Sequence, residues 1–346
     1  MIDKIIEPDV NVLVVTNMYP TEQNRAYGIF VKEQVESLRK EGVSIDVFFV
    51  NGKESRLRYI SGISELVGKI KSKRYDIIHA HHTYCIYPIK IASAVACIKS
   101  PLILTFHEGE VHRQNDSSIK NVDFIKRLVF SKRLKIIALK MVDMVIAVQA
   151  EMLKKLNYNG KSVVLPCGVN TALFRPLGKI WCRQKIGLPL DKKIVFFPAS
   201  PANKQKGFDI LRESIRYINR PDLQIVTGGN LSHADMPYYM NAADVVAQLS
   251  VYEASPSVLK EALAVNVPLI FTDTGDAKMI TGNAEGCFLV ERKPEAVSLK
   301  LNQALAFQGN CNGRDRIFEI NLTLRRVSKI IVSVYKELLG QMVMSH

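Results

Sequence analysis

Short apolar runs alternate with amphipathic segments along almost the whole chain. Runs rich in Val, Ile, Leu and Phe, bounded by polar or turn-forming residues, are typical of buried strands. In the first half of the chain we expect such strands at 11–16, 44–50, 76–81, 101–107 and 144–148. The second half restarts the same rhythm, with strands expected at 193–199, 223–229, 244–250, 268–273 and 287–290.

Segments with helical spacing separate these strands. In "GIFVKEQVESLRKEG", Val31, Val35 and Leu38 fall on one face and Gly42 marks the end of the helix. Further helices are expected at 208–218, 237–243, 257–265 and 324–341, the last being long, amphipathic and followed by no strand. Strands that alternate with helices form parallel sheets covered on both faces, so the pattern predicts an α/β chain with two doubly wound, Rossmann-like domains.

The join between the domains is expected where Pro176, Gly178, Gly187 and Pro189 interrupt the periodicity. We predict an N-terminal domain over residues 1–177 and a C-terminal domain over 178–328, with the final helix, about 329–346, packed back on the first domain. Two such domains are expected to face a central cleft. Ligands of open α/β sheets bind beyond the carboxyl ends of the strands, so residues that follow strands are the candidates for chemistry.

The net charge of the chain limits the classes of binding partner that we expect. The 346-residue chain carries 47 basic and 33 acidic residues, a net charge of +14 that suits nucleic acid, anionic lipid or phosphate-bearing ligands. The six cysteines are scattered without a Cys-x-x-Cys pair, which argues against a zinc site and suits a reducing cytoplasm. The acidic start lacks the plan of a signal peptide, and no uncharged run is long enough to span a membrane. We therefore expect a cytoplasmic protein.

Two carboxylates bracket the start of an expected helix in "EASPSVLKEALAV". Ser255 is a good N-cap and Pro256 suits the first turn, so the helix should begin there, with Glu253 just outside it and Glu261 inside it. The free backbone N–H groups of residues 257–259 would form an anion site. Carboxylates on both sides could accept hydrogen bonds from sugar or ribose hydroxyls. The alternative is that Glu261 is a surface charge and Glu253 a loop charge.

Other residues that follow strands could meet a phosphate or a sugar. Lys204 and Lys206 precede Gly207 and a helix, a natural place for a phosphate clamp, although two solvated loop lysines would give the same pattern. Gly28 begins the first helix, where a missing side chain would let phosphate approach the backbone. His107 ends a strand at the edge expected to face the cleft, but a lone histidine is more often structural than catalytic.

The stretch "DIIHAHHTY" raises the question of a metal. His79 and His81 alternate along an expected strand and His82 follows, yet no carboxylate or further histidine stands at ligand spacing. We therefore expect no metal site.

Together these segments occur in the order typical of one family. The relevant strings are "YPTEQNRAYGIFVKEQVESLRKEG", "YDIIHAHHTY", "LTFHEGE", "VDMVIAVQAEMLKKL", "VLPCGVNTALFRP", "KQKGFDIL", "MPYYMNAADVVAQLSVYEASPSVLKEALAVNVPLIFTDTGD" and "GCFLV". On them the chain resembles the retaining GT-B glycosyltransferases of family 4 (glycosyl transferases group 1) over nearly its whole length. The pair Glu253 and Glu261, a Glu-x7-Glu motif inside its characteristic context, is the most specific part of the resemblance.

The resemblance implies a nucleotide-diphosphate sugar as donor substrate and no cofactor. Glu253 would contact hydroxyls of the donor sugar near the reacting carbon, and Glu261 would bind the ribose hydroxyls. Backbone amides of the helix start, at Ser255, Ser257 and Val258, would hold sugar or phosphate oxygens.

The remaining candidates would act on the leaving group and the sugar. Lys206 would neutralise the diphosphate, Gly28 would let the N-terminal loop approach it, and His107 would contact the sugar from the first domain. Because Lys206 and backbone amides can stabilise the leaving phosphate, no divalent metal is required. The resemblance further implies retention of anomeric configuration.

The chain departs from the family pattern at several positions. The family usually has an Arg before the clamp lysine, whereas this chain has Ser200 and Pro201 in that region, which makes Lys204 the candidate substitute. Ala254 stands where Gly is common, and Ser257 where Asn is common.

Other functions fit parts of the sequence. An epimerase or hydrolase acting on a nucleotide-sugar would keep the fold and change the reaction. A nucleic-acid-binding protein would need aromatic residues interleaved with basic ones on a platform, and we expect no nucleic acid as partner. A nicotinamide dehydrogenase is disfavoured because no Gly-x-Gly-x-x-Gly follows a strand.

A basic stretch in the first half suggests a membrane surface. "IKNVDFIKRLVFSKRLKIIALKM" sets apolar residues among Lys126, Arg127, Lys132 and Arg133, an arrangement that suits anionic headgroups. A solvated basic face covering a core helix is the alternative. Because many acceptors of the family are lipid-linked or membrane-bound, we expect peripheral attachment to the cytoplasmic leaflet and a lipid-linked or surface-polysaccharide acceptor.

Overall fold

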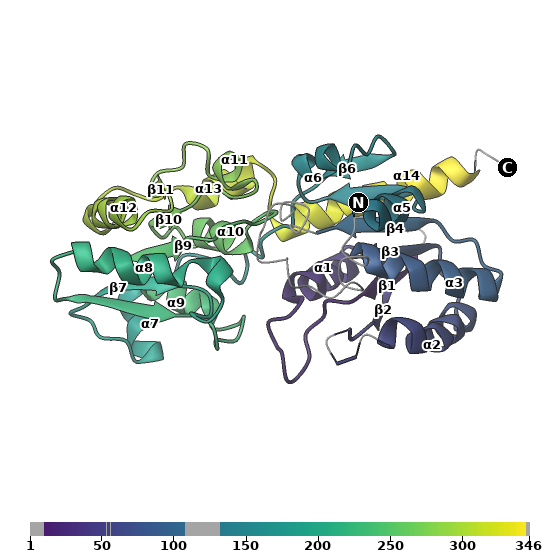
Figure 1. The fold of residues 1–346 in the computed structure, drawn as a ribbon, viewed down its shortest axis with the longest axis horizontal. Coiled ribbons are helices and arrows are strands. Elements are labelled where there is room, and N and C mark those ends of the chain that lie inside the picture. Colours follow the sequence, from purple (N-terminus) through teal and green to yellow (C-terminus); the bar gives the residue numbers. More distant parts are fainter. Residues whose placement is uncertain (1–9, 53, 56, 108–131, 344–346) are drawn as a thin grey trace, which may run out of the picture. The chain divides into compact units, whose positions relative to one another are not determined.

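The computed structural model describes residues 10–52, 54–55, 57–107 and 132–343, without the side chains of 341–343. The chain forms two compact units (Figure 1). Unit 1 comprises Met1–Pro166 and Val327–His346, and unit 2 comprises Cys167–Arg326. The chain thus leaves unit 1, completes unit 2 and returns to unit 1 with its last helix.

The change of unit comes before the join expected at 177/178, and backbone pairing gives the reason. The N–H of Val169 donates to the carbonyl of Leu322 at 2.9 Å, and the carbonyl of Val169 accepts from the N–H of Leu324 at 2.7 Å. The segment that enters unit 2 is therefore held against the segment that leaves it, ahead of the Pro and Gly residues that interrupt the sequence pattern.

Unit 1 is built on a six-stranded parallel sheet in the order β2-β1-β3-β4-β5-β6, with helices on its faces (Figure 1). The strands are β1 (Asn11–Thr16), β2 (Ser44–Phe49), β3 (Ile77–His81), β4 (Leu102–Phe106), β5 (Met144–Ala147) and β6 (Ser162–Val164). The described helices are α1 (Ile29–Lys40), α2 (Arg58–Ser72), the 3-10 helix η1 (Thr83–Cys85), α3 (Ile86–Ala96), α5 (Lys132–Lys140), α6 (Ala150–Lys155) and α14 (Leu324–Val343).

Unit 2 repeats this plan with a five-stranded parallel sheet in the order β11-β10-β9-β7-β8. The strands are β7 (Lys193–Phe197), β8 (Leu223–Thr227), β9 (Val245–Gln248), β10 (Leu269–Phe271) and β11 (Cys287–Leu289). The helices are α7 (Lys179–Ile186), the 3-10 helix η4 (Lys204–Lys206), α8 (Phe208–Ser214), the 3-10 helix η5 (Ile215–Tyr217), α9 (Met236–Ala242), α10 (Ser257–Ala264), α11 (Ala277–Thr281), α12 (Pro294–Ala306) and α13 (Gly313–Glu319). The two parallel sheets confirm the predicted α/β class.

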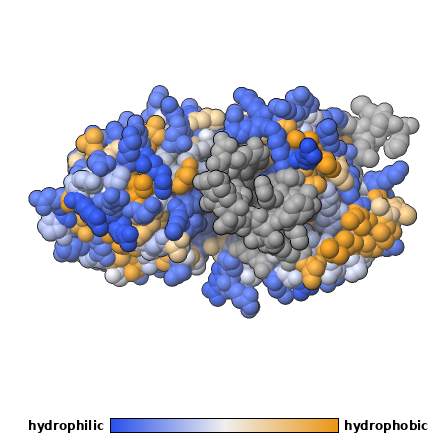
Figure 2. Space-filling view, viewed as in Figure 1, coloured by the Kyte–Doolittle hydropathy of each residue, from blue (hydrophilic) through white to orange (hydrophobic). Residues whose placement is uncertain are grey.

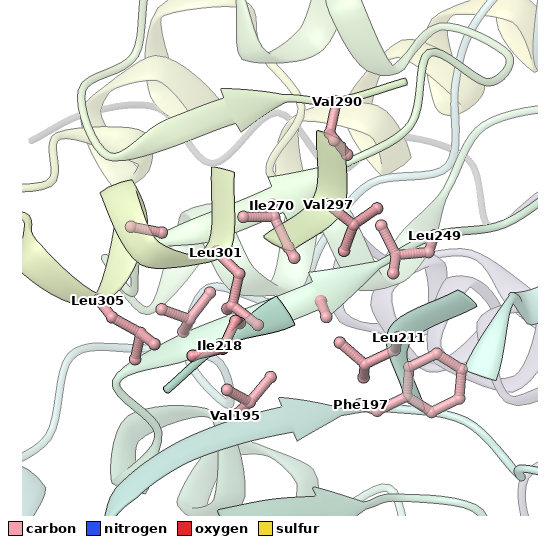
Figure 3. Packing of buried hydrophobic residues seen from close by; sticks show 13 residues of the cluster. Val195, Phe197, Leu211, Ile218, Leu249, Ile270, Val290, Val297, Leu301 and Leu305 are labelled. Carbon is pink, nitrogen blue, oxygen red and sulfur yellow. The ribbon is translucent and has the colours of Figure 1, made fainter. Parts of the chain in front are cut away.

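One apolar core cluster packs α8 and α12 against the unit 2 sheet (Figure 3). Phe197 of β7 and Leu211 of α8 belong to it, as do Ile270 of β10 and Leu301 of α12. Burial of each such side chain contributes about 1.5–3 kcal/mol. The cluster fixes the strands, and with them the loops that follow their carboxyl ends.

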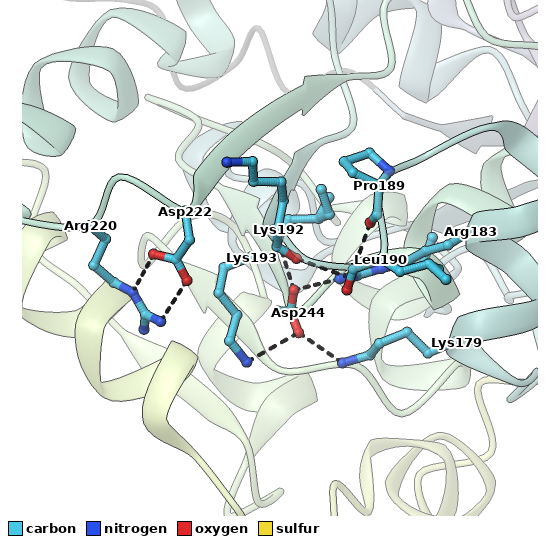
Figure 4. Close-up of polar contacts among 11 residues, drawn as sticks. Lys179, Arg183, Pro189, Leu190, Lys192, Lys193, Arg220, Asp222 and Asp244 are labelled. Atoms are coloured by element: carbon cyan, nitrogen blue, oxygen red, sulfur yellow. Dashed lines mark hydrogen bonds and ion pairs between the residues drawn. The ribbon is translucent and has the colours of Figure 1, made fainter.

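A buried arginine braces the opposite, amino end of the same sheet (Figure 4). Arg183 of α7 donates to the carbonyl of Ala242 and to the carboxylate of Asp244, at 2.9 and 2.7 Å. Asp244 also accepts from the N–H of Ile194 and lies 3.0 Å from the ammonium of Lys179. Burial by itself raises the pKa of Asp244, but these donors and cations outweigh it and lower the pKa below its ordinary value. The brace fixes β7 and β9 side by side.

Candidate functional site

The candidate site is assembled from loops at the carboxyl edge of the unit 2 sheet. β7 pairs with β9 and β9 with β10, and all are parallel, so the segments that follow them start from one edge. Those segments carry Lys206, Glu253 and Asp276 respectively. The topology therefore places at one edge groups that are far apart in the sequence.

Lys206 and Glu253 form an ion pair. The lysine Nζ lies 2.5 Å from Glu253 Oε1, and their side chains are 31% and 18% exposed. The Ser250 hydroxyl donates to the same Glu253 oxygen at 2.7 Å. The backbone carbonyl of Ser250 accepts in turn from the hydroxyl of Thr272, which lies just after β10. Charge-assisted hydrogen bonds of this kind are short and orient both partners. The carboxylate predicted to meet the donor sugar is thus held in place by the cation predicted to meet its diphosphate.

Gln205 joins the two loops around this pair. Its carbonyl accepts from the N–H of Val251 at 2.8 Å. Its side-chain amide donates to the carbonyl of Tyr252 at 3.2 Å and accepts from the Tyr252 hydroxyl at 2.8 Å. Neither loop can therefore move without the other, which preorganises the ion pair.

Gly207 has a steric reason to be glycine. Its φ is +82°, in the left-handed region, and a Cβ at this position would meet the backbone carbonyl oxygen of Leu249. This close approach sets η4, which ends at Lys206, against the end of β9. Gly207 thereby determines where the lysine side chain starts.

The expectation that Ser255 caps the following helix is wrong. α10 begins at Ser257, and Pro256 occupies the N-cap position with φ −68° and ψ 112° and no side-chain cap. Because Ser255 lies one residue further out, its hydroxyl instead accepts from the Nζ of Lys260 at 3.0 Å. The first N–H groups of α10, on Ser257 and Val258, have no partner inside the helix by geometry and remain a candidate anion site.

Glu261 is not the surface charge that the simpler alternative supposed. It is 9% exposed, and the residues around it in α10, from Leu259 to Ala264, are buried as well. Ser257 at the helix start is exposed and Val258 is partly buried. Lys204 is exposed on η4, away from the buried part of the site. Its role as a substitute for the family arginine stays a prediction.

The sequence analysis did not predict two buried charged residues, Lys260 and Asp276. Lys260 is 1% exposed and donates to the carbonyl of Cys167 at 2.7 Å as well as to Ser255. Asp276 is 7% exposed, and neither of its carboxylate oxygens makes a hydrogen bond of ordinary geometry to a described residue. Burial raises the pKa of Asp276, and the charge of Lys260 opposes that effect.

The loop after β10 touches the loop that carries Glu253. Gly275 has φ +61°, and a Cβ there would meet the carbonyl oxygens of Glu253 and Ala254. Asp276 follows directly.

The burial of Lys260 had one available signal in the sequence, a charged residue between apolar neighbours in "VLKEALAV".

The other two candidates, Gly28 and His107, belong to unit 1. Gly28 has φ +69°, and a Cβ there would meet the backbone of Met18 and Tyr19, so close packing between the loop after β1 and the start of α1 requires glycine. His107 follows β4 and packs on Phe30 of α1 with ring centroids 4.9 Å apart. Both lie at the carboxyl edge of the unit 1 sheet.

His79 and His81 lie inward on β3 rather than forming a ligand cluster. The two ring nitrogens of His79 lie 2.6 Å from the hydroxyls of Tyr335 and Thr105. Burial lowers the pKa of His81 to about 3 and that of His79 well below its usual range. Within the described part of the chain no three His, Cys, Asp or Glu side chains gather as a metal site would need.

The predicted membrane-facing stretch lies mainly outside the described residues. Lys126 and Arg127, with the apolar positions up to 129, lie outside the described residues, whereas Lys132 and Arg133 are exposed on α5. Ile136 on the same helix is partly buried and Leu139 is fully buried. None of the described helices is both long enough and apolar enough to cross a bilayer.

Comparison with known sequences gives two family matches that together span both units. Residues 4–173 match the Glycosyltransferase Family 4 family, and residues 222–317 match the Glycosyl transferases group 1 family. A Bacillus subtilis (strain 168) protein named as a teichuronic acid biosynthesis glycosyltransferase, TuaC, is 24% identical over 355 residues. That alignment covers 84% of this chain and 87% of TuaC.

Solved structures share the fold at low sequence identity. Sucrose-phosphate synthase from Thermosynechococcus elongatus superposes with a TM-score of 0.77 and 18% identity, covering 96% of this chain and 100% of that one. Anabaena HepE in complex with UDP gives a TM-score of 0.68 and 14% identity, with coverage of 95% and 100%. Two parallel-sheet domains on one chain are thus an architecture that these enzymes share.

Proposed function

Because the chain belongs to the GT-B glycosyltransferases of family 4 (group 1), we propose that it moves a sugar from a nucleotide-diphosphate donor to an acceptor hydroxyl. We further propose that the reaction retains anomeric configuration and needs no metal ion. The observation that supports this most directly is the Lys206–Glu253 pair, which lies at the carboxyl edge of a parallel sheet, close in sequence to the first turn of α10.

The groups at this edge suit the charges of the reaction. The bond between the anomeric carbon and the diphosphate oxygen breaks, and its electron pair stays on the diphosphate. Lys206 and the first N–H groups of α10 would stabilise that negative charge, a task for preorganised donors. The acceptor oxygen bonds to the same face of the anomeric carbon, and its proton passes to the departing phosphate oxygen.

The two glutamates would bind different parts of the donor. Glu253 would accept hydrogen bonds from sugar hydroxyls, because its second carboxylate oxygen, Oε2, is not the atom that contacts Lys206 and Ser250. Glu261, deeper in the unit, would accept from the ribose hydroxyls. His107 and Gly28 would serve the sugar and the diphosphate from unit 1. A nucleotide-sugar donor is in keeping with HepE, whose structures were solved with UDP and with UDP-glucose.

A panel of nucleotide-sugars tests the donor. The purified protein should be stabilised against thermal unfolding by one base and sugar over the others, and by the matching nucleoside diphosphate. With that donor and an acceptor, proton NMR of the product should show the donor's anomeric configuration. Inversion would contradict the proposed course. Rapid donor turnover without any acceptor would instead support a nucleotide-sugar epimerase or hydrolase.

We also propose a lipid-linked or surface-polysaccharide acceptor and peripheral attachment to the cytoplasmic face of a membrane. TuaC is named for the biosynthesis of teichuronic acid. Within unit 1, Figure 2 shows apolar side chains gathered over α3, where Ile91 and Val95 are 49% and 58% exposed beside Lys90 and Lys99. Apolar side chains flanked by lysines suit an anionic interface.

Liposome co-sedimentation tests the attachment. Binding should require anionic lipid and weaken with salt, and it should fall when Lys126, Arg127, Lys132 and Arg133 are changed to Ser. Changing Ile91 and Val95 to Ser should weaken it independently of salt. Equal binding to neutral vesicles, or no binding to either kind, would defeat the attachment while leaving the sugar-transfer proposal intact.

A further inference from the structure

Three imidazole rings lie in a row at the carboxyl edge of the unit 1 sheet. The rings of His79 and His81 are 4.6 Å apart between centroids with planes at 26°, and those of His81 and His107 are 5.2 Å apart at 14°. His79 and His81 lie on β3, and His107 follows β4, its neighbour in the sheet. The row therefore runs from the interior of the unit to the residue predicted to contact the donor sugar.

The inner end of the row is fixed by hydroxyl groups. His79 has its two nitrogens 2.6 Å from the hydroxyls of Tyr335 and Thr105, and both His79 and Tyr335 are fully buried. Tyr335 comes from α14, the last helix of the chain. His79 thus presents a rigid ring face on which His81 stacks.

A hydrogen bond joins the outer two rings. Nδ1 of His81 lies 2.9 Å from Nε2 of His107, a distance at which one hydrogen lies between the two nitrogens. His81 is 1% exposed, so a positive charge on it would be costly and it stays neutral at ordinary pH. If His81 accepts through Nδ1, His107 must carry its hydrogen on Nε2; if His81 donates, His107 must accept there. The tautomers of the two rings are therefore coupled.

We propose that His81 is a positioning residue that holds His107 in one tautomer and one ring orientation. Its ring stacks on one partner and its Nδ1 bonds to the other, while Phe30 packs on His107 from α1. The choice of tautomer decides whether Nδ1 of His107 donates or accepts a hydrogen bond, and hence which sugar hydroxyl geometry it can serve. This inference rests on the proposed function only in taking His107 as a contact of the donor sugar.

Two substitutions of His81 separate the hydrogen bond from the packing. His81→Phe keeps a stacked ring without nitrogen, whereas His81→Asn places an amide close to the position of Nδ1. We expect His81→Phe to lower kcat/KM for the donor by on the order of ten- to a hundredfold, the scale of a misplaced contact. His81→Asn should recover much of that loss. His233→Asn, in unit 2, controls for the loss of a histidine as such.

Imidazole nitrogen NMR gives a readout that needs no substrate. The chain has seven histidines, so spectra of protein labelled with ¹⁵N-histidine can be assigned by substitution. In the wild-type protein His107 should show one dominant tautomer. In His81→Phe its two nitrogen shifts should move toward the average of a mixture, while in His81→Asn and His233→Asn they should stay close to those of the wild type. Circular dichroism confirms that each variant is folded.

The outcomes distinguish the two proposals. If His107 shows the same tautomer in the wild type and in folded His81→Phe, the positioning role is wrong, whatever the activity. If the tautomer changes but no nucleotide-sugar is ever bound or consumed, the proposed function fails and the coupling of the rings stands. If the tautomer changes and sugar transfer is unaffected, His107 is not a contact that matters to the reaction.

Discussion

Lys206 and Glu253 meet across two loops of unit 2, with Nζ 2.5 Å from Oε1 although 47 residues separate them in the sequence. An ammonium has three N–H donors and a carboxylate two acceptor oxygens, so each group can bond to the other and still face a ligand. The pair therefore orients both groups before any substrate contact. Removing either side chain also leaves the other less well oriented, so a substitution at one position affects the function of both.

The paired carboxylates and the lysine should each be needed for transfer. We expect Lys206→Ala, Glu253→Gln and Glu261→Gln to lower kcat/KM by on the order of ten- to a hundredfold, because each loses a charge-assisted contact worth about 1.5–3 kcal/mol. Glu261→Gln should act mainly on donor KM and Glu253→Gln mainly on kcat. Steady-state kinetics with the identified donor and acceptor provide the measurement.

The double variant Lys206→Ala with Glu253→Gln tests the coupling. Because the two side chains touch, its loss should be smaller than the product of the single losses. Lys278→Ala, on the exposed side of α11, serves as a matched lysine control that should leave the rate unchanged. Wild-type rates in both Glu253→Gln and Glu261→Gln would show that the site is assigned to the wrong residues.

Activity should survive the removal of divalent ions. Lys206 and the amides of α10 already offer positive partners to a diphosphate, so a metal would add little to the charge balance. Transfer should be measured after dialysis against excess EDTA and again with magnesium or manganese restored. A complete loss that either metal reverses would overturn the proposal of a metal-independent reaction.

Gly207 should be needed for its shape, and Gly187 offers a matched control. Both have positive φ, at +82° and +71°, but a Cβ at Gly187 meets nothing within 4 Å, whereas one at Gly207 meets the carbonyl oxygen of Leu249. Alanine at either site should cost roughly 1–2 kcal/mol of stability for the left-handed backbone. Gly207→Ala should cost more in urea unfolding and should also lower transfer by displacing Lys206. Equal effects of the two variants would contradict the steric argument.

The sequence was sufficient to predict most of the strands, though not β6, and it did not predict which strands are neighbours. Apolar runs such as "NVLVVT" and "KIVFFPA" became β1 and β7 within a residue or two, because burial on both faces demands such runs. Periodicity does not say which strand lies beside which. The contact between His81 and His107 depends on β3 pairing with β4, and the contact between Lys206 and Glu253 on the adjacency of β7 and β9.

Local rules failed where tertiary packing overrode them. Ser255 has the side chain of a good helix cap, yet Pro256 has an extended ψ of 112°, so the helix begins at Ser257, and the Ser255 hydroxyl accepts a hydrogen bond from Lys260 instead. A lysine in the middle of a helix usually faces water, whereas Lys260 is buried because α10 is covered on nearly every side. The steric need for glycine at Gly28 and Gly207 could not be predicted from the sequence, because it depends on backbone from other segments coming close.

Unit 1 should lose stability in acid because of its buried histidines. Burial lowers the pKa of His81 to about 3 in the folded chain, against an ordinary value of 6.5. The unfolded chain therefore binds protons that the folded chain resists, so the contribution is complete above about pH 6.5 and is lost as the pH falls toward 3. His79, whose pKa is also lowered, acts in the same direction. Each histidine contributes a slope of about 1.4 kcal/mol per pH unit in that window.

Urea unfolding between pH 7.5 and 4.5 measures this slope. Among the described residues, the groups hydrogen-bonded to the pair are the hydroxyls of Tyr335 and Thr105 and the ring of His107, and none of these is a carboxylate that would hold a proton on His79 or His81. His81→Asn should flatten the dependence of the free energy of unfolding on pH. An equally steep slope in that variant would show that other groups cause it.

Lys260 and Asp276 should be energetically coupled in unit 2. The lysine charge acts on the Asp276 carboxyl, and both side chains are buried. Lys260→Met should cost about 1–3 kcal/mol, because it removes the buried donor to the Cys167 carbonyl and the Ser255 hydroxyl. Asp276→Asn should cost less, because burial already raises the pKa of its carboxyl. The combined variant should cost less than the sum of the two. The exposed pair Glu291–Lys293, with contact at 2.9 Å, is a control in which the same cycle should show little coupling.

The return of α14 to unit 1 has a consequence for how the protein is made. Ile331, Tyr335 and Leu338 of this helix are buried, and Tyr335 bonds to His79, a residue of the third strand. A ribosome synthesises these residues only after unit 2 has been made in full, so the strands of unit 1 that precede unit 2 wait for their missing core residues. During that interval the sheet of unit 1 exposes the apolar surface that α14 later covers. Nascent chains stalled before residue 324 should therefore bind chaperones through unit 1, and chains extended through α14 should not.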